Sequence, residues 1–261
     1  MMLEVKNGDF AYAREVALLE DISFNIGKGE ILTILGPNGV GKTTLLKCAT
    51  SLLKWERGTT FIDSIPLDEL TTNEIWKKIG YVPQFGGGVF SYTVLDMVLM
   101  GRAPYLGMFS LPSEHDVKIA KESIEMVGIP YLEKKSCLEI SGGEKQLVMI
   151  ARALTSEPKI MILDEPESHL DFKNQLLILE ILKKIAREKG ISCIINTHFP
   201  SHALQISDKT LMLGKGKKII FGRTREVITE DNLRDFFGVN VKIVAFANKG
   251  KIMETIVPLS D

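Results

Sequence analysis

The sequence predicts an α/β fold in which a helical segment is inserted between two α/β parts. Short, continuous apolar runs at residues 31–35 and 160–163 are typical of parallel strands buried on both faces. Helical patterns follow both runs, at residues 42–53 and 174–189. Between about residues 89 and 140 the character of the chain changes to helical, which indicates the insertion.

The N-terminal part predicts β structure followed by one strand and one helix. Leu3 and Val5, and later residues 22–26, alternate apolar and polar side chains, as half-buried strands do. Turns are expected at residues 7–8 and 27–29, where glycines occur. Further strands are expected at residues 58–62 and 79–82.

The inserted segment contains two helices with recognisable starts. Ser113 with Asp116 resembles a capping box, and Gly128 and Pro130 end the helix that it opens. The second helix is expected at residues 141–155.

The C-terminal part resumes the α/β pattern. Strands are expected at residues 191–195, 210–213 and 218–221, the last two as edge strands around the turn at residues 214–216. A short helix at residues 232–237 and a hairpin of residues 239–246 and 251–257 complete the chain.

Composition sets limits on the class of protein. The chain has 261 residues, of which 45% are hydrophobic and 25% charged, so it suffices for one large domain or two small lobes. Its formal net charge of -1 gives no global basic field, so no nucleic-acid partner is expected. No apolar run approaches the ~18 to 20 residues of a membrane span. A membrane function would therefore need a second chain.

The cysteines indicate a reducing compartment. Cys48, Cys137 and Cys193 are odd in number, widely spaced and in apolar contexts. We expect them to be reduced, buried side chains of a cytosolic protein. No Cys-x-x-Cys pair or histidine cluster accompanies them, so a metal site of that kind is not expected.

Residues 36–43 fit the phosphate-loop pattern G-x-x-x-x-G-K-[ST], with a predicted strand before it and a helix after it. Glycines let successive backbone N–H groups curl around phosphate oxygens, and the helix N-terminus adds its positive end. Lys42 should reach the β- and γ-phosphates, and the Thr43 hydroxyl should bind Mg²⁺. A glycine-rich turn with an incidental lysine is the alternative. The expected ATP-binding residues here are Gly36, Asn38, Gly39, Gly41, Lys42, Thr43 and Thr44.

Two carboxylates follow the apolar run at residues 160–163. Asp164 should lie at the carboxyl edge of the sheet, where ligands bind, and help to hold Mg²⁺. Successive side chains of a strand point to opposite faces, which leaves Glu165 for another task. It would accept a proton from the water that attacks the γ-phosphate, or orient that water. Two ordinary surface acids are the alternative.

Ser141, Gly142 and Gly143 open a predicted helix. Glycines at a helix start carry a cost unless the backbone must approach something closely. A serine with bare N–H groups at this position makes an anion site. A serine cap followed by flexible glycines is the alternative.

The order of these motifs resembles that of the ABC ATPases over about residues 3–225. The motifs are the phosphate loop, Gln84, Ser141-Gly142-Gly143, Leu163-Asp164-Glu165-Pro166 and His198. The resemblance implies a RecA-like P-loop core sheet, an N-terminal antiparallel β subdomain and an inserted α-helical subdomain. It implies one ABC ATPase domain at residues 1–225, with its core at about 1–88 and 156–225 and its helical subdomain at about 89–155. Residues 226–261 form a C-terminal helix plus hairpin extension.

The resemblance also implies roles for single residues. Tyr12 matches the aromatic residue that stacks on adenine, and a surface tyrosine of a sheet is its alternative. Gln84 matches the glutamine that senses Mg²⁺ and the attacking water, and His198 the histidine that touches the γ-phosphate. Ser141, Gly142, Gly143 and Glu144 match the signature that contacts the ATP of a second subunit. Asp171 lies in the loop that crosses the dimer interface.

The implied assembly is a head-to-tail homodimer beneath an integral-membrane permease. Residues 86–88 are three glycines suited to a flexible loop, and residues 84–102 match the surface that meets the permease. Residues 90–106 are similar to importer ATPases for iron complexes, vitamin B12, haem, and molybdate or tungstate. A substrate-binding protein would deliver the cargo, and this chain would lie on the cytoplasmic side of the inner membrane.

Three positions depart from the usual pattern: Glu144, Glu167 and Phe199 stand where glutamine, threonine and aspartate are common. The two glutamates add negative charge near the expected nucleotide interface, which would weaken ATP-driven closure.

The main alternative function is a soluble ABC ATPase of iron–sulfur cluster assembly, which has the same nucleotide motifs. Chromosome-maintenance or translation proteins, an ABC exporter and a non-catalytic binding module are further alternatives. The sequence supplies no coiled coil, tandem cassette or fused span, and it keeps Lys42 and the other catalytic groups.

Overall fold

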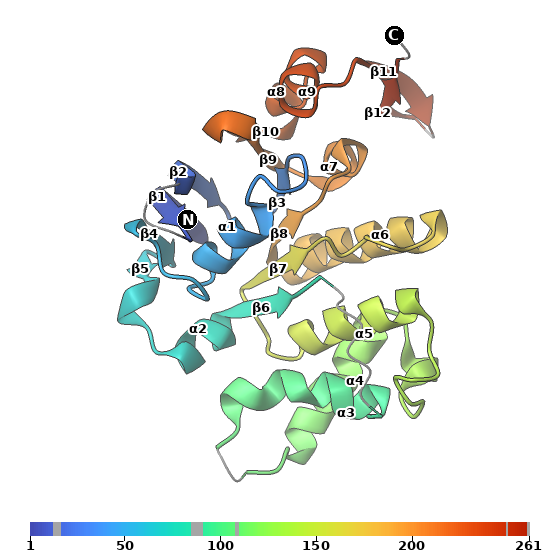
Figure 1. Cartoon of the computed structure of the whole chain (residues 1–261). Coiled ribbons are helices and arrows are strands. Elements are labelled where there is room, and N and C mark those ends of the chain that lie inside the picture. The colour runs from blue at the N-terminus through green and yellow to red at the C-terminus, as the bar shows by residue number, and fades with distance from the viewer. Residues whose placement is uncertain (13–16, 85–90, 108–109, 249, 260–261) are drawn as a thin grey trace. The chain divides into compact units, whose positions relative to one another are not determined.

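The computed structural model describes residues 1–12, 17–84, 91–107, 110–248 and 250–259 (Figure 1). The chain forms two compact units, one of Met1–Glu69 with Ser192–Asp261 and the other of Leu70–Ile191. The first unit is called the nucleotide-loop unit below, and the second the helical unit. Among the described residues, no helix has both the length and the apolar character that crossing a membrane requires.

The nucleotide-loop unit begins with an antiparallel sheet in the order β2-β1-β4-β5. Its strands are β1 Leu3–Ala11, β2 Ala17–Ile26, β4 Arg57–Ile62 and β5 Ile65–Pro66. Leu3 and Val5 alternate with more exposed residues, so one face is buried, as the sequence predicts.

The predicted turn at Asn7 and Gly8 is wrong, because both residues lie inside β1. The register with β2 shifts between Val5 and Gly8, and Asn7 has a φ of 49°. This is bulge geometry, which re-aims a strand without ending it. A Cβ on Gly8 would lie 2.8 Å from the Trp55 ring, so this glycine serves packing.

A second set of strands in this unit is mostly parallel. β3 Ile31–Leu35 pairs in parallel with both β8 Ser192–Asn196 and β9 Lys209–Leu213, and β10 Ile219–Arg223 pairs antiparallel with β9. β9 therefore lies between two strands, and its prediction as an edge strand is wrong. Continuous burial of β3 and β8 fits strands covered on both faces.

Helix α1 Lys42–Ala49 follows β3 and ends four residues before the predicted position. The Thr50 hydroxyl donates to the carbonyls of Leu46 (2.9 Å) and Lys47 (3.1 Å), so it satisfies acceptors of the last turn. Ser51 then adopts a φ of 61°, which stops the helix.

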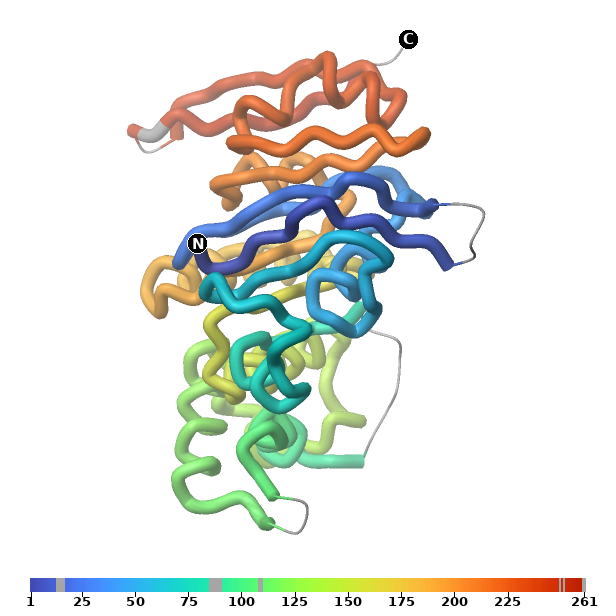
Figure 2. Tube along the Cα trace, turned by 90° about the vertical axis from the view of Figure 1, so that its left-hand side faces the viewer, coloured from blue at the N-terminus to red at the C-terminus, as the bar shows by residue number. Residues whose placement is uncertain are grey.

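The C-terminal extension packs on this unit. Its elements are α9 Glu230–Phe237, β11 Val241–Asn248 and β12 Lys251–Pro258. Before it, the same unit contains α7 Pro200–Ile206, η4 Lys215–Lys217 and α8 Thr224–Val227. β11 and β12 form the predicted hairpin, visible as two extended strands side by side in Figure 2. Leu233 and Val241 join a core cluster with Leu35 and Met212, which ties the extension to β3 and β9.

The helical unit contains a short parallel strand pair and a group of helices. β6 Ile79–Val82 pairs in parallel with β7 Ile160–Asp164. The helices are α2 Thr72–Lys78, α3 Val94–Leu99, η2 Met100–Tyr105, α4 Glu114–Met126, η3 Pro130–Leu132, α5 Gly142–Leu154 and α6 Phe172–Lys189. A short η1, Leu67–Glu69, closes the first segment of the other unit. The predicted fold class, α/β with a parallel sheet, an antiparallel β part and helices, is confirmed.

Capping explains where the helices of this unit begin. Thr71, Ser113 and Ser141 each form a capping box with the acidic residue three positions later. The box at Ser113 was predicted, whereas α2 was not, although Thr71 and Glu74 carry the same signal. Helix α7 was also not predicted.

The predicted burial of the three cysteines is confirmed. Cys48, Cys137 and Cys193 are buried free thiols, and no group of three or more His, Cys, Asp or Glu suited to a metal occurs in the described part of the chain. Burial raises the pKa of the Cys48 thiol to about 12. At pH 8 the native thiol is therefore protonated and unreactive.

We expect a thiol-specific disulfide reagent at pH 8 to leave Cys48 unmodified in the native protein and to modify it fully in denaturant. Peptide mass mapping after a timed reaction measures this difference. Rapid stoichiometric modification of native Cys48 would contradict the buried, protonated thiol.

Candidate functional site

The phosphate loop joins β3 to α1, and its glycines are required by geometry. A Cβ on Gly36 would lie 2.3 Å from the carbonyl oxygen of Leu213, so no side chain fits there. Gly39 and Gly41 have φ values of 84° and 101°, the left-handed region that favours glycine. The loop therefore needs these three glycines to keep its shape.

Lys42 folds back over this loop. Its side chain is buried, and Nζ donates to the carbonyl oxygens of Gly36 (2.7 Å) and Pro37 (3.1 Å). The ammonium group is thereby held at the centre of the loop, where backbone N–H groups and a helix N-terminus favour an anion. Thr43 and Thr44 are the next residues of α1.

Tyr12 is fixed beside the loop although its ring is exposed. Its hydroxyl and Thr44 Oγ1 are hydrogen-bonded at 3.0 Å, and its ring meets Phe10 edge to face at 4.9 Å between centroids. The side chain of Tyr12 remains 67% exposed, which leaves ring surface available for stacking on a base.

A pocket of about 530 Å³ lies at Tyr12 and the loop. This volume falls in the range typical of sites for small molecules and cofactors. Its lining residues are Tyr12, Ala17, Leu18, Gly39, Val40 and the turn of residues 214–217.

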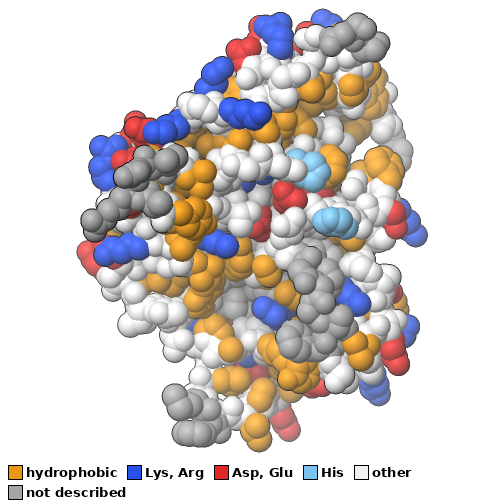
Figure 3. Space-filling model, in the orientation of Figure 1, with side chains coloured by type: hydrophobic (Ala, Val, Ile, Leu, Met, Phe, Trp, Pro, Cys, Tyr) orange, Lys and Arg blue, Asp and Glu red, His pale blue; other side chains and the backbone are white. Residues whose placement is uncertain are grey.

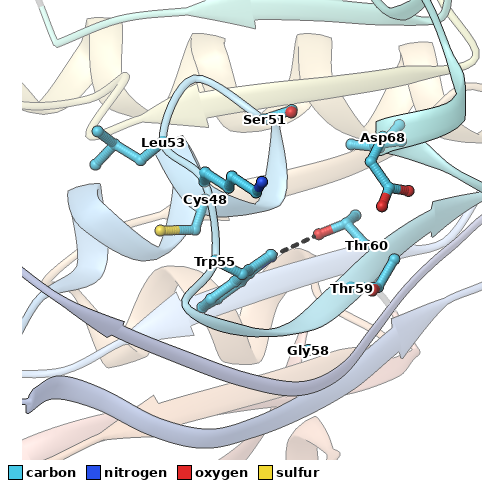
Figure 4. A pocket seen from close by; sticks show the side chains of 10 residues that line it. Cys48, Ser51, Leu53, Trp55, Gly58, Thr59, Thr60 and Asp68 are labelled. Atoms are coloured by element: carbon cyan, nitrogen blue, oxygen red, sulfur yellow. Dashed lines mark hydrogen bonds between the residues drawn. The ribbon is translucent and has the colours of Figure 1, made fainter.

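A second pocket in the same unit has another character (Figure 4). Its volume is about 70 Å³, room for only a few water molecules. Trp55 Nε1 donates to Thr60 Oγ1 across it at 3.0 Å, and Cys48 and Asp68 lie at its walls. Its size excludes a nucleotide, so the pocket at Tyr12 is the candidate nucleotide site.

His198 lies in the same unit, just after β8. The backbone N–H of Thr197 donates to the Ile34 carbonyl (3.1 Å), so this segment runs beside the end of β3 that leads into the phosphate loop. The rings of His198 and Phe199 lie 4.0 Å apart, and Phe199 stacks further on His202. Phe199 therefore packs against the histidine, at a position where aspartate is common in the resembling family.

The acidic strand end lies in the helical unit. Asp164 is the last residue of β7 and is buried. Burial first, and the Asp164 charge second, raise the pKa of Tyr81 on the neighbouring strand to about 12, so this phenol stays neutral. Glu165 follows with a φ of 49°, unusual for a residue with a side chain. The chain thus turns sharply between the two carboxylates.

Gln84 and Ser168 both donate hydrogen bonds to Glu165. Gln84 Nε2 donates to Glu165 Oε2 at 3.1 Å, and the Ser168 hydroxyl donates to the same oxygen at 2.8 Å. The structure thus brings Gln84 and Glu165 together, although 81 positions separate them. Ser168 was not predicted as a partner of Glu165, although its position three residues later is a usable signal.

Ser141 caps α5 and is locked by Glu144. The backbone N–H and the hydroxyl of Ser141 both donate to Glu144 Oε2 at 2.8 Å, and the Tyr131 hydroxyl donates to Oε1 at 3.2 Å. The bonds from the Ser141 backbone and then its hydroxyl lower the pKa of Glu144, so this carboxylate is ionised at neutral pH. A negative charge therefore lies beside the signature serine.

Asp171 caps α6 and connects to the signature through Asn174. Asp171 accepts hydrogen bonds from the backbone N–H (2.8 Å) and the side-chain amide (2.9 Å) of Asn174. A Cβ on Gly143 would lie 2.8 Å from that amide, so Gly143 is needed for packing between α5 and α6. Asn174 was not predicted as a site residue.

Gly142 is different, because a Cβ there would meet no other atom within 4 Å. Packing within the chain does not require this glycine, and Gly costs stability in a helix. The open space above the helix start fits the approach of a ligand or a second chain.

We expect Gly142→Ala to leave the thermal stability unchanged or slightly raised, because it removes a poor helix former without a clash. If a second copy approaches this helix start, the same change lowers ATP hydrolysis at least about tenfold, through loss of close backbone contact. Thermal unfolding and phosphate release measure the two effects. Unchanged hydrolysis would show that Gly142 has no role at the interface.

The surface visible in Figure 3 carries positive and negative side chains interspersed, without one dominating basic area.

The predicted loop at residues 86–88 lies outside the described residues, as does the start of the segment predicted to be helical from residue 89. The site residues that the structure describes thus fall into two groups. Tyr12, the phosphate loop and His198 belong to one unit, and Gln84, Asp164, Glu165, residues 141–144 and Asp171 to the other.

An α/β protein with an intact phosphate loop and an acidic strand end is a nucleoside-triphosphate-binding protein by its site chemistry. The sequence pattern of the ABC transporter family matches residues 19–168, and that of an AAA domain matches residues 136–201. The chain belongs to the ABC transporter family, as one of its ATP-binding chains, and is an ATPase of the ABC type.

Relatives and solved structures agree with this membership. The chain is 37% identical to the molybdate import ATP-binding protein MolC of Haemophilus influenzae, covering 90% of this chain and 87% of MolC. It is 35% identical to an iron chelatin transport ATP-binding protein of Helicobacter pylori, covering 95% and 98% of the two chains.

Among solved structures, an inward-facing metal-chelate type ABC transporter aligns with a TM-score of 0.88 and 34% identity, covering 99% of this chain and 98% of that chain. A dimeric ATP-binding cassette in a post-hydrolysis state with ADP and phosphate aligns with a TM-score of 0.72 and 30% identity, covering 86% and 99%.

Proposed function

We propose that this chain is the ATP-hydrolysing subunit of an ABC importer that energises uptake of a metal chelate or a related cargo through a separate permease. The cargo class includes iron–siderophore, haem, cobalamin, and molybdate or tungstate. The observation that carries this proposal is the similarity over nearly the whole chain to a metal-chelate type ABC transporter. The similarity to MolC supports the same class of cargo.

The phosphate loop binds the triphosphate of ATP, and Tyr12 stacks on adenine. Lys42 contacts the β- and γ-phosphates from its place in the loop, and Asn38, Gly39, Gly41 and Thr44 complete the phosphate contacts. Thr43, Gln84 and Asp164 supply a hydroxyl, an amide and a carboxylate oxygen, the hard donors that suit Mg²⁺. When bound there, Mg²⁺ would neutralise charge on the phosphate oxygens.

Hydrolysis uses Glu165 as the general base. Its carboxylate accepts a proton from the water that attacks the γ-phosphate. Gln84 and Ser168 hold Oε2 of this carboxylate, so its orientation is set before water arrives. Gln84 also orients the attacking water, and His198 contacts the γ-phosphate.

Two copies of the chain bind two ATP molecules head to tail. Ser141, Gly142 and Gly143 of one copy contact the γ-phosphate bound to the other, and Asp171 lies in the loop that crosses the interface. The dimeric cassette among the similar structures supports this arrangement. The charge of Glu144 opposes an incoming phosphate, so closure is weaker than with glutamine at this position.

The permease contacts residues 84–102 of this chain, on the cytoplasmic side of the inner membrane. A substrate-binding protein takes part indirectly, through the permease. In this proposal residues 1–225 are one ABC ATPase domain, with its core at about 1–88 and 156–225, its helical subdomain at about 89–155, and residues 226–261 as an extension. The transport names of the relatives support an importer over iron–sulfur cluster assembly.

The test is to identify what copurifies with the protein from its own cells. A tagged Glu165→Gln chain is trapped with ATP, and membranes are solubilised gently before capture. A tagged Lys42→Ala chain serves as the control that cannot be trapped. Enrichment of a polytopic permease with Glu165→Gln would support the importer. Copurification of a soluble scaffold without a membrane chain would contradict the importer, but not the assignment of the chain as an ATPase.

A further inference from the structure

The turn between β9 and β10, residues 214–217, lines the pocket at Tyr12 together with the phosphate loop. It contributes Gly214, Lys215, Gly216 and Lys217 to the wall. None of these residues belongs to a motif that the sequence analysis singled out for nucleotide binding. They come from a part of the chain more than 170 positions beyond the phosphate loop.

Close packing holds this turn against the loop. The carbonyl oxygen of Leu213, the last residue of β9, lies only 2.3 Å from the position that a Cβ on Gly36 would occupy. The backbone at the start of the turn therefore touches the first glycine of the phosphate loop. The two backbone segments are in direct contact, with no space for a side chain between them. The turn therefore lies directly beside the start of the phosphate loop.

Helix α9 packs against the start of the turn. A Cβ on Gly214 would lie 2.9 Å from the Phe236 ring of α9, and Gly214 is buried. Phe236 also packs against the core cluster that contains Leu35, the residue before the loop. Phe236 of the extension thus packs both against the turn and against the core at the strand that leads into the loop.

The two lysines of the turn differ in their partners. Lys217 forms an ion pair with Glu20 of β2. Lys215 is exposed and makes no hydrogen bond or ion pair with the described residues. The described residues that line the pocket include both lysines and no acidic residue, which favours an anionic ligand.

We propose that the turn of residues 214–217 is a wall of the nucleotide site and that Lys215 is the group of this wall that contacts the bound nucleotide. This inference rests on the proposed binding of ATP at the phosphate loop. The Lys215 ammonium donates to an oxygen or ring nitrogen of the nucleotide, and Lys217 stays with Glu20. The residue thereby adds affinity without taking part in the chemical step.

The test compares Lys215→Met with Lys218→Met, which removes the same charge at the residue that follows the turn and lies outside the pocket lining. Titration calorimetry with the purified full chain, in the Glu165→Gln background to prevent hydrolysis, measures binding of ATP, ADP and adenosine. We expect Lys215→Met to weaken ATP binding about two- to fivefold, the upper part of the range for an exposed charge contact, and Lys218→Met to have no effect. Lys215→Arg, which keeps the charge, should restore the affinity.

The three ligands locate the contact. A loss for ATP and ADP but not adenosine assigns Lys215 to phosphate oxygens, and an equal loss for all three assigns it to the base or sugar. Both results support the proposal that Lys215 contacts the bound nucleotide. If Lys215→Met and Lys218→Met both bind ATP as tightly as the chain without these substitutions, the proposed contact of Lys215 is wrong. The proposed function would not be affected by that result. Absence of ATP binding by the unsubstituted chain would instead contradict the proposed function.

Discussion

Replacing Glu165 by glutamine is expected to lower the rate of ATP hydrolysis about 10²- to 10⁴-fold, the usual size for loss of a general base. Glutamine keeps the shape of the side chain and can still accept hydrogen bonds from Gln84 and Ser168 through its carbonyl oxygen. It cannot accept the proton of the attacking water. The loss should therefore appear in the turnover number, whereas ATP affinity stays within about twofold.

Phosphate release under saturating ATP measures the turnover, and calorimetry measures the affinity. The matched control is Glu180→Gln, which removes the same charge from an exposed position on α6 and should hydrolyse ATP normally. Ser168→Ala, which removes the bond from the Ser168 hydroxyl to Oε2, is expected to show a smaller loss than Glu165→Gln. A Glu165→Gln protein with near-normal turnover would rule out this residue as the base.

The features that the sequence predicted well depend on local geometry. The phosphate loop needs glycine at Gly39 and Gly41 because of their own backbone angles, and the motif records that need directly. The capping box at Ser113 is likewise complete within four residues. Such features can be predicted from one segment without knowledge of its neighbours.

The errors arise where a distant residue decides. Gly8 resembled a turn residue, but its lack of a side chain makes room for Trp55, and the strand continues through it. β9 seemed an edge strand because its hairpin with β10 is local, whereas its parallel pairing with β3 joins segments far apart in the chain. Neither contact leaves a signal in the surrounding sequence.

The candidate site shows the same division. Local motifs predicted the phosphate loop, and the resemblance to ABC ATPases predicted the roles of Gln84, Tyr12 and the signature. The bond from Gln84 to Glu165 required the parallel pairing of β6 with β7, which no motif contains. The turn of residues 214–217 was not predicted to line the pocket at Tyr12, because in the sequence it looks like an ordinary hairpin connection between β9 and β10.

Gly101 offers the clearest case of a glycine needed for packing, and Gly101→Ala is expected to destabilise the protein by about 3 kcal/mol, at the upper end for overpacking of a rigid core. A Cβ there would lie 2.0 Å from the carbonyl oxygen of Arg152 in α5 and 3.1 Å from Thr155. Both contacts are with parts of a packed helix end, so η2 itself must shift.

The shift would also disturb the next residue, Arg102. This buried guanidinium donates to Asp116 and Glu157 at 2.8 Å each and to the Thr155 carbonyl at 3.0 Å, and it lies 4.0 Å over the Tyr105 ring. A buried charge that loses its partners is strongly unfavourable. One methyl group at Gly101 therefore acts on packing and on a buried ion network together.

Thermal unfolding followed by circular dichroism should show a Tm about 6–12 °C lower for Gly101→Ala, from ~2–4 °C per kcal/mol for a chain of this size. Gly142→Ala is the matched control, because the same methyl group meets open space at the start of α5 and should not lower the Tm. A Tm of Gly101→Ala equal to that of the control would mean that η2 adjusts without strain. Packing within this chain would then not require glycine at position 101. Contact with the permease, proposed for residues 84–102, would be the remaining explanation.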